Sequence, residues 1–239
     1  MLNQKTLSKI KQVALKEDWD NSFSGKSKGN QHLLRTANIA KFLAKKTSAN
    51  LLIVEAGALL HDVPLASGDD YDYNRNKLIA RKVLRQFDLS KSKLEEIAEC
   101  VASHEGTVKP KTMEAKIVHD ADVLEKTGIL GIIRHTWKLT NLQKIHNEDI
   151  NDEVIQEILD HLKFRRNRIQ TPLAKKFSSY LTDNLDIDQV KVIIKMTSKL
   201  ANRGIITEKI ALKISNELSV DQKKKLKSQL NLTYLRNFR

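Results

Sequence analysis

Three histidines that lie beside carboxylates or at the ends of predicted helices are the residues of this sequence best suited to bind a metal ion. They are His32, His61 and His104. Asp62 follows His61 directly, where an apolar helical segment ends, and this places an imidazole nitrogen and a carboxylate oxygen at the edge of a cavity. Adjacent helical residues differ by about 100°, so both can approach one ion only at such a helix end. A lone histidine is more often structural than a ligand, and only the order of these residues favours a metal site.

Other kinds of catalytic site have no support in the sequence. No P-loop, dinucleotide-binding, serine hydrolase or HExxH zinc protease pattern occurs. The single cysteine, Cys100, excludes an intrachain disulfide and the four-cysteine and Cys2His2 zinc modules. It lies in an apolar helical pattern, so we expect it in the core. One cysteine and the lack of a long apolar segment lead us to expect a cytoplasmic protein that does not enter a membrane.

The elements that position these residues are predicted to be helices. The chain has only 8 glycines and 3 prolines, and most apolar residues recur every three or four positions. The segment 51–61 is apolar on nearly all sides, as a helix at the centre of a core is. The polar segment 63–73 that follows is predicted to be an active-site loop. We expect helices over 2–19, 31–46, 51–61, 75–86, 92–103, 114–124, 128–140 and 152–164, with helical periodicity continuing to about 184, and no strand.

Positive charge is concentrated at the end of the chain. The formal net charge is +13, and residues 189–239 hold twelve basic and three acidic residues, a difference of nine. Such a balance favours polyanionic partners such as nucleotides or nucleic acid. A short acidic turn at 183–188 precedes this segment. We therefore predict two parts, residues 1–185 and a basic helical extension over 186–239.

The order and spacing of four motifs resemble the HD-domain metal-dependent phosphohydrolases, in particular their small bacterial and archaeal members. The motifs are HLLR at 32–35, AGALLHD at 56–62, SHEG at 103–106 and HDADVLEKTGILGIIR at 119–134. The resemblance is strong over residues 30–134 and extends weakly to about 181. It implies an all-α HD-domain bundle that carries the basic extension. It also implies hydrolysis of a small phosphorylated substrate, with a nucleotide as the expected substrate.

The resemblance also implies a set of metal ligands. They are His32, His61, Asp62 and Asp122. Asp122 is preferred to Asp120 because the family's ligand follows an alanine and precedes an apolar residue. Asp120 would then orient a ligand or lie on the helix surface. Nitrogen and carboxylate donors suit one divalent ion, with manganese favoured and iron, cobalt, nickel or magnesium as alternatives. Such an ion lowers the pKa of bound water and produces a hydroxide nucleophile.

Basic side chains and further acids are expected around this ion. Arg35, one helical turn after His32, can hold a phosphate bidentately, and Lys126 and Arg134 are weaker candidates for the same role. His104 either contacts the phosphate or the attacking water, or it is a ligand of a second metal ion. The second histidine expected for two metals is replaced by Asn76, which favours one metal. We expect catalytic roles for Asp62, His104 and Glu105, and the candidates to protonate the leaving group are Glu105, Asp69 and Asp70.

A nucleic-acid-binding protein is the alternative. In that case the basic extension would hold a phosphate backbone, and the HD site would be degenerate or act on the polymer. Aromatic residues make up only 5% of the chain, which leaves few stacking platforms for single strands. The motifs specify neither the base, sugar and number of phosphates of a nucleotide substrate nor the oligomeric state.

Overall fold

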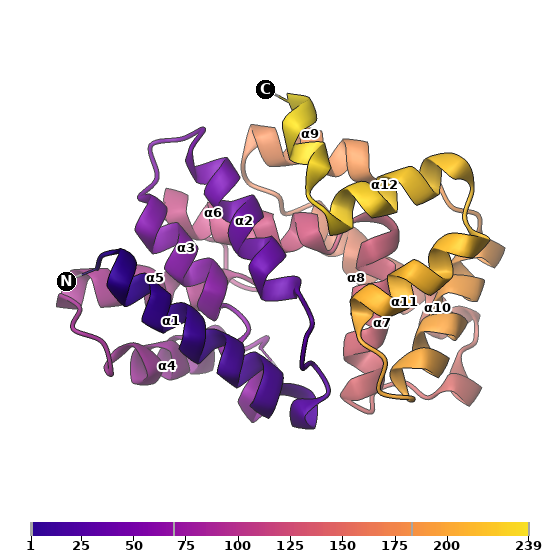
Figure 1. Cartoon of the computed structure of the whole chain (residues 1–239), viewed down its shortest axis with the longest axis horizontal. Helices are drawn as coiled ribbons and strands as arrows, with labels where there is room; N and C mark the ends of the chain where they lie inside the picture. The colour runs from indigo at the N-terminus through magenta and orange to yellow at the C-terminus, as the bar shows by residue number, and fades with distance from the viewer. Residues whose placement is uncertain (1, 69, 183, 239) are drawn as a thin grey trace. The chain divides into compact units, whose positions relative to one another are not determined.

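The structure is a computed structural model that describes residues 2–68, 70–182 and 184–238. These residues form α-helices and short 3₁₀ or π turns, with no β-strand among them, which confirms the all-α prediction (Figure 1). The helices are α1 (Gln4–Lys16), α2 (His32–Ala44), α3 (Leu51–Leu60), α4 (Tyr73–Leu84), α5 (Lys91–Ser103), α6 (Met113–Glu125), α7 (Gly128–Asn141), α8 (Asp152–Arg166), α9 (Pro172–Leu181), α10 (Ile187–Ala201), α11 (Thr207–Ile214) and α12 (Val220–Leu230).

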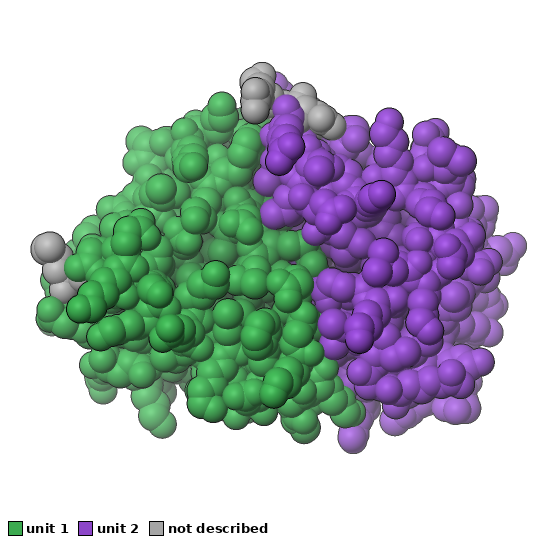
Figure 2. Space-filling model, viewed as in Figure 1, with its two compact units in different colours: residues 1–123, 168–175 green, residues 124–167, 176–239 purple. Residues whose placement is uncertain are grey.

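The chain divides into two compact units, coloured separately in Figure 2. Unit 1 consists of residues 1–123 and 168–175, and unit 2 of residues 124–167 and 176–239. The boundaries fall near the end of α6 and within α9. The predicted division into a main domain over residues 1–185 and a basic helical extension over residues 186–239 stays a prediction.

Helix α3 is the centre of unit 1. It packs against α1, α2 and α5, and seven of its ten residues are buried. Gly57 lets α5 approach closely, because a Cβ at this position would lie 2.6 Å from the Cβ of Cys100. Cys100 is completely buried, as expected, and burial raises the pKa of its thiol well above the usual value. An apolar helix surrounded by other helices therefore carries the His61–Asp62 pair at its end.

Local hydrogen bonds set the bounds of the elements around that pair. The side chain of Asn50 accepts hydrogen bonds from the backbone N–H groups of Leu52 and Ile53 and caps the start of α3. After Asp62, the predicted loop contains a short 3₁₀ turn, Val63–Ser67. Asp72 caps α4, which begins at Tyr73, two residues earlier than expected. The segment between α3 and α4 is thus held at both ends by rigid helices.

Unit 2 is built around α7. This helix packs against α8, α10, α11 and α12, and twelve of its fourteen residues are buried. The indole N–H of Trp137 donates to the carbonyl of Ile205, and the side-chain amide of Gln229 donates to the carbonyl of Thr127. Helices of the basic segment therefore share a core with α7 and α8.

The first helix is shorter than its periodicity predicts. Helix α1 ends at Lys16, and a π turn, Glu17–Asn21, follows it. The indole N–H of Trp19 donates to the carbonyl of Asn30, a contact between residues eleven positions apart that periodicity cannot predict.

Among the described residues, no helix combines the length and apolar character needed to cross a bilayer.

Candidate metal centre

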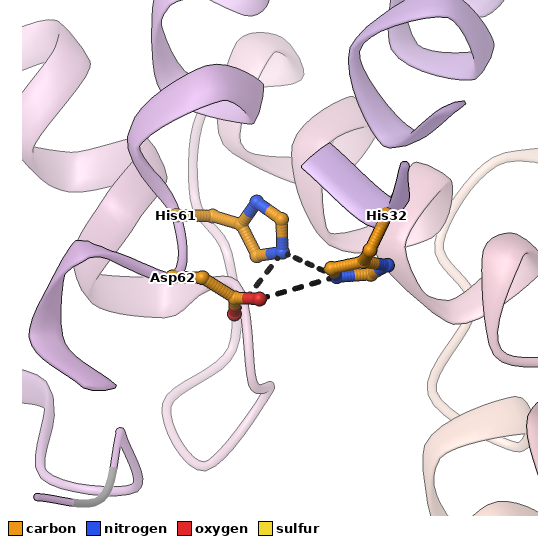
Figure 3. A group of neighbouring side chains, drawn as sticks. All are labelled: His32, His61 and Asp62. Atoms are coloured by element: carbon orange, nitrogen blue, oxygen red, sulfur yellow. Dashed lines mark hydrogen bonds and ion pairs between the residues drawn. The ribbon is translucent and has the colours of Figure 1, made fainter. Parts of the chain in front are cut away.

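His32, His61 and Asp62 meet because each lies at a helix end (Figure 3). His32 is the first residue of α2, His61 caps the C-terminus of α3, and Asp62 is the next residue, where the chain turns into the 3₁₀ segment. Helix α3 ends at Leu60, and just beyond this helix end the two adjacent side chains approach each other to 3.2 Å. Nδ1 of His61 lies 2.8 Å from the carbonyl oxygen of Ala58 and donates to it, which directs Nε2 into the cluster.

The ligand atoms of the predicted metal site lie close together and are buried. Nε2 of His32 and Nε2 of His61 are 3.1 Å apart, and both lie 3.3 Å from Oδ1 of Asp122. Asp62 approaches His61 at 3.2 Å and His32 at 3.3 Å. All four side chains are at most 2% exposed. Donors bound to one ion at about 2.0–2.2 Å are separated by about 3.0–3.5 Å, so this spacing fits a divalent cation.

The nature of the donors supports the same interpretation. His61 uses its Nδ1–H on a backbone carbonyl, so in the neutral ring Nε2 carries a lone pair directed towards His32. Two imidazole nitrogens and two carboxylates in so small a buried volume are the donors that first-row divalent metals and magnesium accept. His32, His61, Asp62 and Asp122 are therefore suited to hold the metal.

The two aspartates of the DAD sequence have different environments. Asp122 faces the two histidines, whereas Asp120 accepts hydrogen bonds from the backbone N–H groups of Gln170 and Thr171 and from the Thr171 hydroxyl, at 2.7–2.8 Å. Asp120 is fully buried, so it does not lie on the helix surface. Burial raises its pKa to about 6, although these hydrogen bonds oppose the shift. Its role is to hold the segment that begins α9.

His104 lies next to this cluster, together with two acids. It caps the C-terminus of α5, its Nδ1 donates to the Val101 carbonyl, and its ring is 5.0 Å from that of His61. Nε2 of His104 is 3.5 Å from Asp70, 3.8 Å from Glu105 and 4.0 Å from Asp62. Burial lowers the pKa of His104, but the hydrogen bond to Asp70 and the charges of Glu105 and Asp70 outweigh burial and raise it.

The structure extends the group of potential ligands beyond the predicted four. Asp62, Asp70 and His104 form a second set of three donor atoms within 4.8 Å of one another, and His104, Glu105 and Asp122 form a third. Of the three expected proton donors, Asp70 and Glu105 are buried beside His104, and Asp69 lies outside the described residues.

Two residues near the centre make contacts that the sequence did not predict. The side-chain amide of Asn76, on α4, donates to the backbone carbonyl of Asp70 at 2.5 Å and so anchors the residue that faces His104. His119 was not among the candidate residues, yet its Nδ1 lies 2.7 Å from the carbonyl oxygen of His104. Gly106 is the signal that could have revealed this contact. Its φ is +75°, and a Cβ there would lie 2.7 Å from the His119 ring.

The predicted phosphate-binding residues are distributed over both units. In unit 1, Arg35 is buried on α2, one turn after His32. In unit 2, Nε of Arg134 lies 4.0 Å from Glu125, and its Nη1 donates to the Thr207 hydroxyl. Lys126 is 9% exposed and lines a cavity of unit 2. Phosphate binding by these three residues stays a prediction.

Comparison with known sequences identifies the family of this site. Residues 30–127 match the family model of the HD domain. A ribonuclease Y of Thermosipho melanesiensis is 32% identical over 182 residues, which are 73% of this chain and 33% of that protein. The uncharacterized protein YpgQ of Bacillus subtilis is 27% identical over 138 residues, 54% of this chain and 66% of YpgQ. The chain thus spans about a third or less of the length of each of these ribonuclease Y relatives.

Solved structures support the same fold. The crystal structure of YpgQ superposes with a TM-score of 0.55 at 21% identity, and the match covers 75% of this chain and 89% of YpgQ. The crystal structure of YpgQ in complex with ADP superposes with a TM-score of 0.51 at 18% identity, and that match covers 73% of this chain and 88% of YpgQ. A Lactobacillus plantarum protein gives 0.58 at 20% identity and covers 85% and 98%. Residues 30–127 are therefore an HD domain, the domain of metal-dependent phosphohydrolases, and the histidine and aspartate cluster lies within them.

Proposed function

We propose that this protein hydrolyses a phosphate ester or anhydride bond of a nucleotide with one divalent cation, manganese being the first candidate. The observation that carries the proposal is the convergence of His32, His61, Asp62 and Asp122, with donor atoms 3.1–3.3 Å apart in a buried site. A nucleotide is favoured because the structural neighbour YpgQ was solved with ADP.

The bound cation would supply a hydroxide near neutral pH and neutralise charge on phosphate. The chain's own residues hold the site rigid. Ala58 orients the ring of His61 through its carbonyl group, and Val101 orients His104 in the same way. Rings fixed by a hydrogen bond at Nδ1 keep Nε2 in place without further reorganisation.

His104 and its acidic neighbours would assist the departure of the leaving group. The raised pKa of His104 favours its protonated form, which can contact a phosphate oxygen. Glu105 and Asp70 each lie within 4 Å of His104 Nε2, and either carboxylate would take the proton of His104 and deliver it to the leaving group. Arg35, buried on α2 one turn after His32, would hold the remaining phosphate oxygens.

A screen for released phosphate and pyrophosphate tests this function. Chelator-treated protein is supplied with manganese, cobalt, nickel, iron or magnesium and with nucleoside mono-, di- and triphosphates. We expect metal-dependent release that Asp62→Ala abolishes and that Asp88→Ala, an exposed aspartate, leaves unchanged. Metal-dependent release of equal rate in Asp62→Ala would refute the site.

Hydrolysis of an RNA phosphodiester is the second candidate. The similarity to ribonuclease Y favours it, and so does the excess of basic residues over 189–239. A labelled single-stranded RNA incubated with metal and with the wild-type or Asp62→Ala protein would detect it. RNA bound through phosphate contacts would also dissociate steeply as salt increases. RNA cleavage that requires Asp62, with no turnover of any nucleotide, would replace the first proposal by this one.

A further inference from the structure

Unit 2 contains a cavity of about 240 Å³ that is formed by the start of α7, the C-terminal half of α8 and the chain that leads into α10. Three basic residues line it, and none of the described lining residues is acidic. The basic residues are Lys126, Lys163 and Arg166, and the apolar ones include Ile132, Leu159, Leu162, Leu185 and Val190. The cavity thus combines a cationic part with an aliphatic wall.

The basic residues that line the cavity come from two parts of the chain. Lys163 and Arg166 are one turn apart on α8, and a cation near a helix C-terminus is by itself ordinary. Lys126 does not belong to that helix, and it is 9% exposed. Nη1 of Arg166 donates to the hydroxyl of Thr182, another lining residue, and this contact fixes the guanidinium at the cavity.

The backbone adds to the positive potential. Thr127 and Gly128, which begin α7, line the cavity. The Thr127 side chain makes no cap hydrogen bond, and the first turn of α7 contains no acidic residue. The first N–H groups of a helix carry partial positive charge and bind anions readily. They reinforce the three basic side chains.

The positive charge of Lys126 also acts on a buried histidine of α7. Burial and the positive charges of His161, Lys138 and Lys126 hold the pKa of His135 well below its usual range. The ring of His135 stacks on that of His161 at 4.1 Å.

We propose that this cavity binds a small organic phosphate, with the phosphate group among Lys126, Lys163, Arg166 and the start of α7, and the carbon skeleton against the aliphatic wall. Arginine and lysine together suit a phosphate dianion. The volume is smaller than the roughly 300–1,000 Å³ of pockets that take drug-sized ligands. It therefore selects a molecule with few atoms beyond the phosphate. This site does not depend on the proposed hydrolysis.

Binding of phenyl phosphate to the full-length Asp62→Ala protein tests the proposal. Metal is removed with chelator so that the probe is not hydrolysed, and calorimetry is performed at low salt. We expect one saturable site with a dissociation constant below about 1 mM. Inorganic phosphate, which lacks the apolar group, is expected to bind several-fold more weakly.

The decisive variants carry further substitutions in that same background. Lys163→Ala together with Arg166→Ala removes two of the three cations and should weaken binding at least about tenfold. Lys163 is exposed, so Lys163→Ala alone keeps the fold and should still weaken binding measurably. The control is Lys223→Ala with Lys224→Ala, two exposed lysines of α12 that do not line the cavity and should leave binding unchanged.

Three results would overturn the proposal. They are no saturable binding of phenyl phosphate, equal affinity for inorganic phosphate, and unchanged affinity in the variants at Lys163 and Arg166. The last result would place the probe elsewhere, for example at Arg35. None of these measurements uses catalysis, so they are distinct from a failure of the proposed hydrolysis.

Discussion

Binding of manganese should stabilise this protein through Asp122 and not through Asp120. Oδ1 of Asp122 lies 3.3 Å from Nε2 of both His32 and His61. The oxygens of Asp120, two residues earlier on the same helix, accept hydrogen bonds from Gln170 and Thr171 instead. Both aspartates are buried, so Asp122→Asn and Asp120→Asn are a matched pair of substitutions.

The expected magnitude follows from the linkage between binding and folding. A ligand at one hundred times its dissociation constant stabilises the folded state by about 2.7 kcal/mol. For a chain of this length, 1 kcal/mol corresponds to about 2–4 °C, so manganese should raise the melting temperature of the wild type by about 5–10 °C. If Asp122→Asn weakens binding a hundredfold, the stabilisation at the same concentration falls to about 0.4 kcal/mol, or about 1 °C.

Thermal unfolding of chelator-treated protein, followed by circular dichroism with and without manganese, measures this shift. Asp120→Asn should lower the melting temperature of the metal-free protein, because it weakens the contacts that hold the start of α9, yet keep the increase on adding manganese. An increase of wild-type size in Asp122→Asn would refute the ligand assignment. So would loss of the increase in Asp120→Asn alone.

Three further predictions concern stability and reactivity. The pKa of His135 is lowered in the folded state, so below about pH 6.5 the unfolded chain binds more protons than the folded chain does. The free energy of unfolding must therefore fall as the pH decreases through that value. Urea unfolding at pH 5.5 and 7.5 should show a smaller difference in this free energy between the two pH values for His135→Phe than for the wild type. Gly106→Ala should lower the free energy of unfolding by about 1–3 kcal/mol more than Gly204→Ala does. Both glycines have positive φ, but only at Gly106 would a Cβ lie 2.7 Å from the His119 ring. Equal losses of stability in urea unfolding would contradict this. Cys100 should react with a thiol reagent only at the rate of unfolding, because it is fully buried and its pKa is raised; rapid labelling of folded protein would show otherwise.

Local sequence was enough to predict the central parts of this fold. The apolar segment 51–61 has no polar face, and such a helix is stable only among other helices, which is how α3 lies among α1, α2 and α5. The polar residues after it could not extend the helix. His61 and Asp62 therefore had to be at its end, and this reasoning did not require any distant residue.

Contacts between distant residues could not be predicted in this way. Asp70 and His104 are 34 positions apart, and Asp120 reaches Thr171 over 51 positions. The amphipathic periodicity of a helix states which face is buried but not which partner covers it. The asparagine at 76, where a histidine was expected, holds the backbone of Asp70, and only the folded structure shows this contact.

The same limit applies to the basic end of the chain. Its composition predicted helices with a charged outer face, and α10, α11 and α12 are present. That α7 packs against all three of them, with Trp137 bonded to Ile205, was decided by tertiary packing. By itself the sequence predicted the helices, because these depend on local periodicity, and it predicted the candidate metal ligands through the resemblance of its motifs to a known family. Which side chains surround His104, and what encloses the cationic cavity, was decided by the tertiary structure, because burial of apolar faces brings together residues that no local pattern relates.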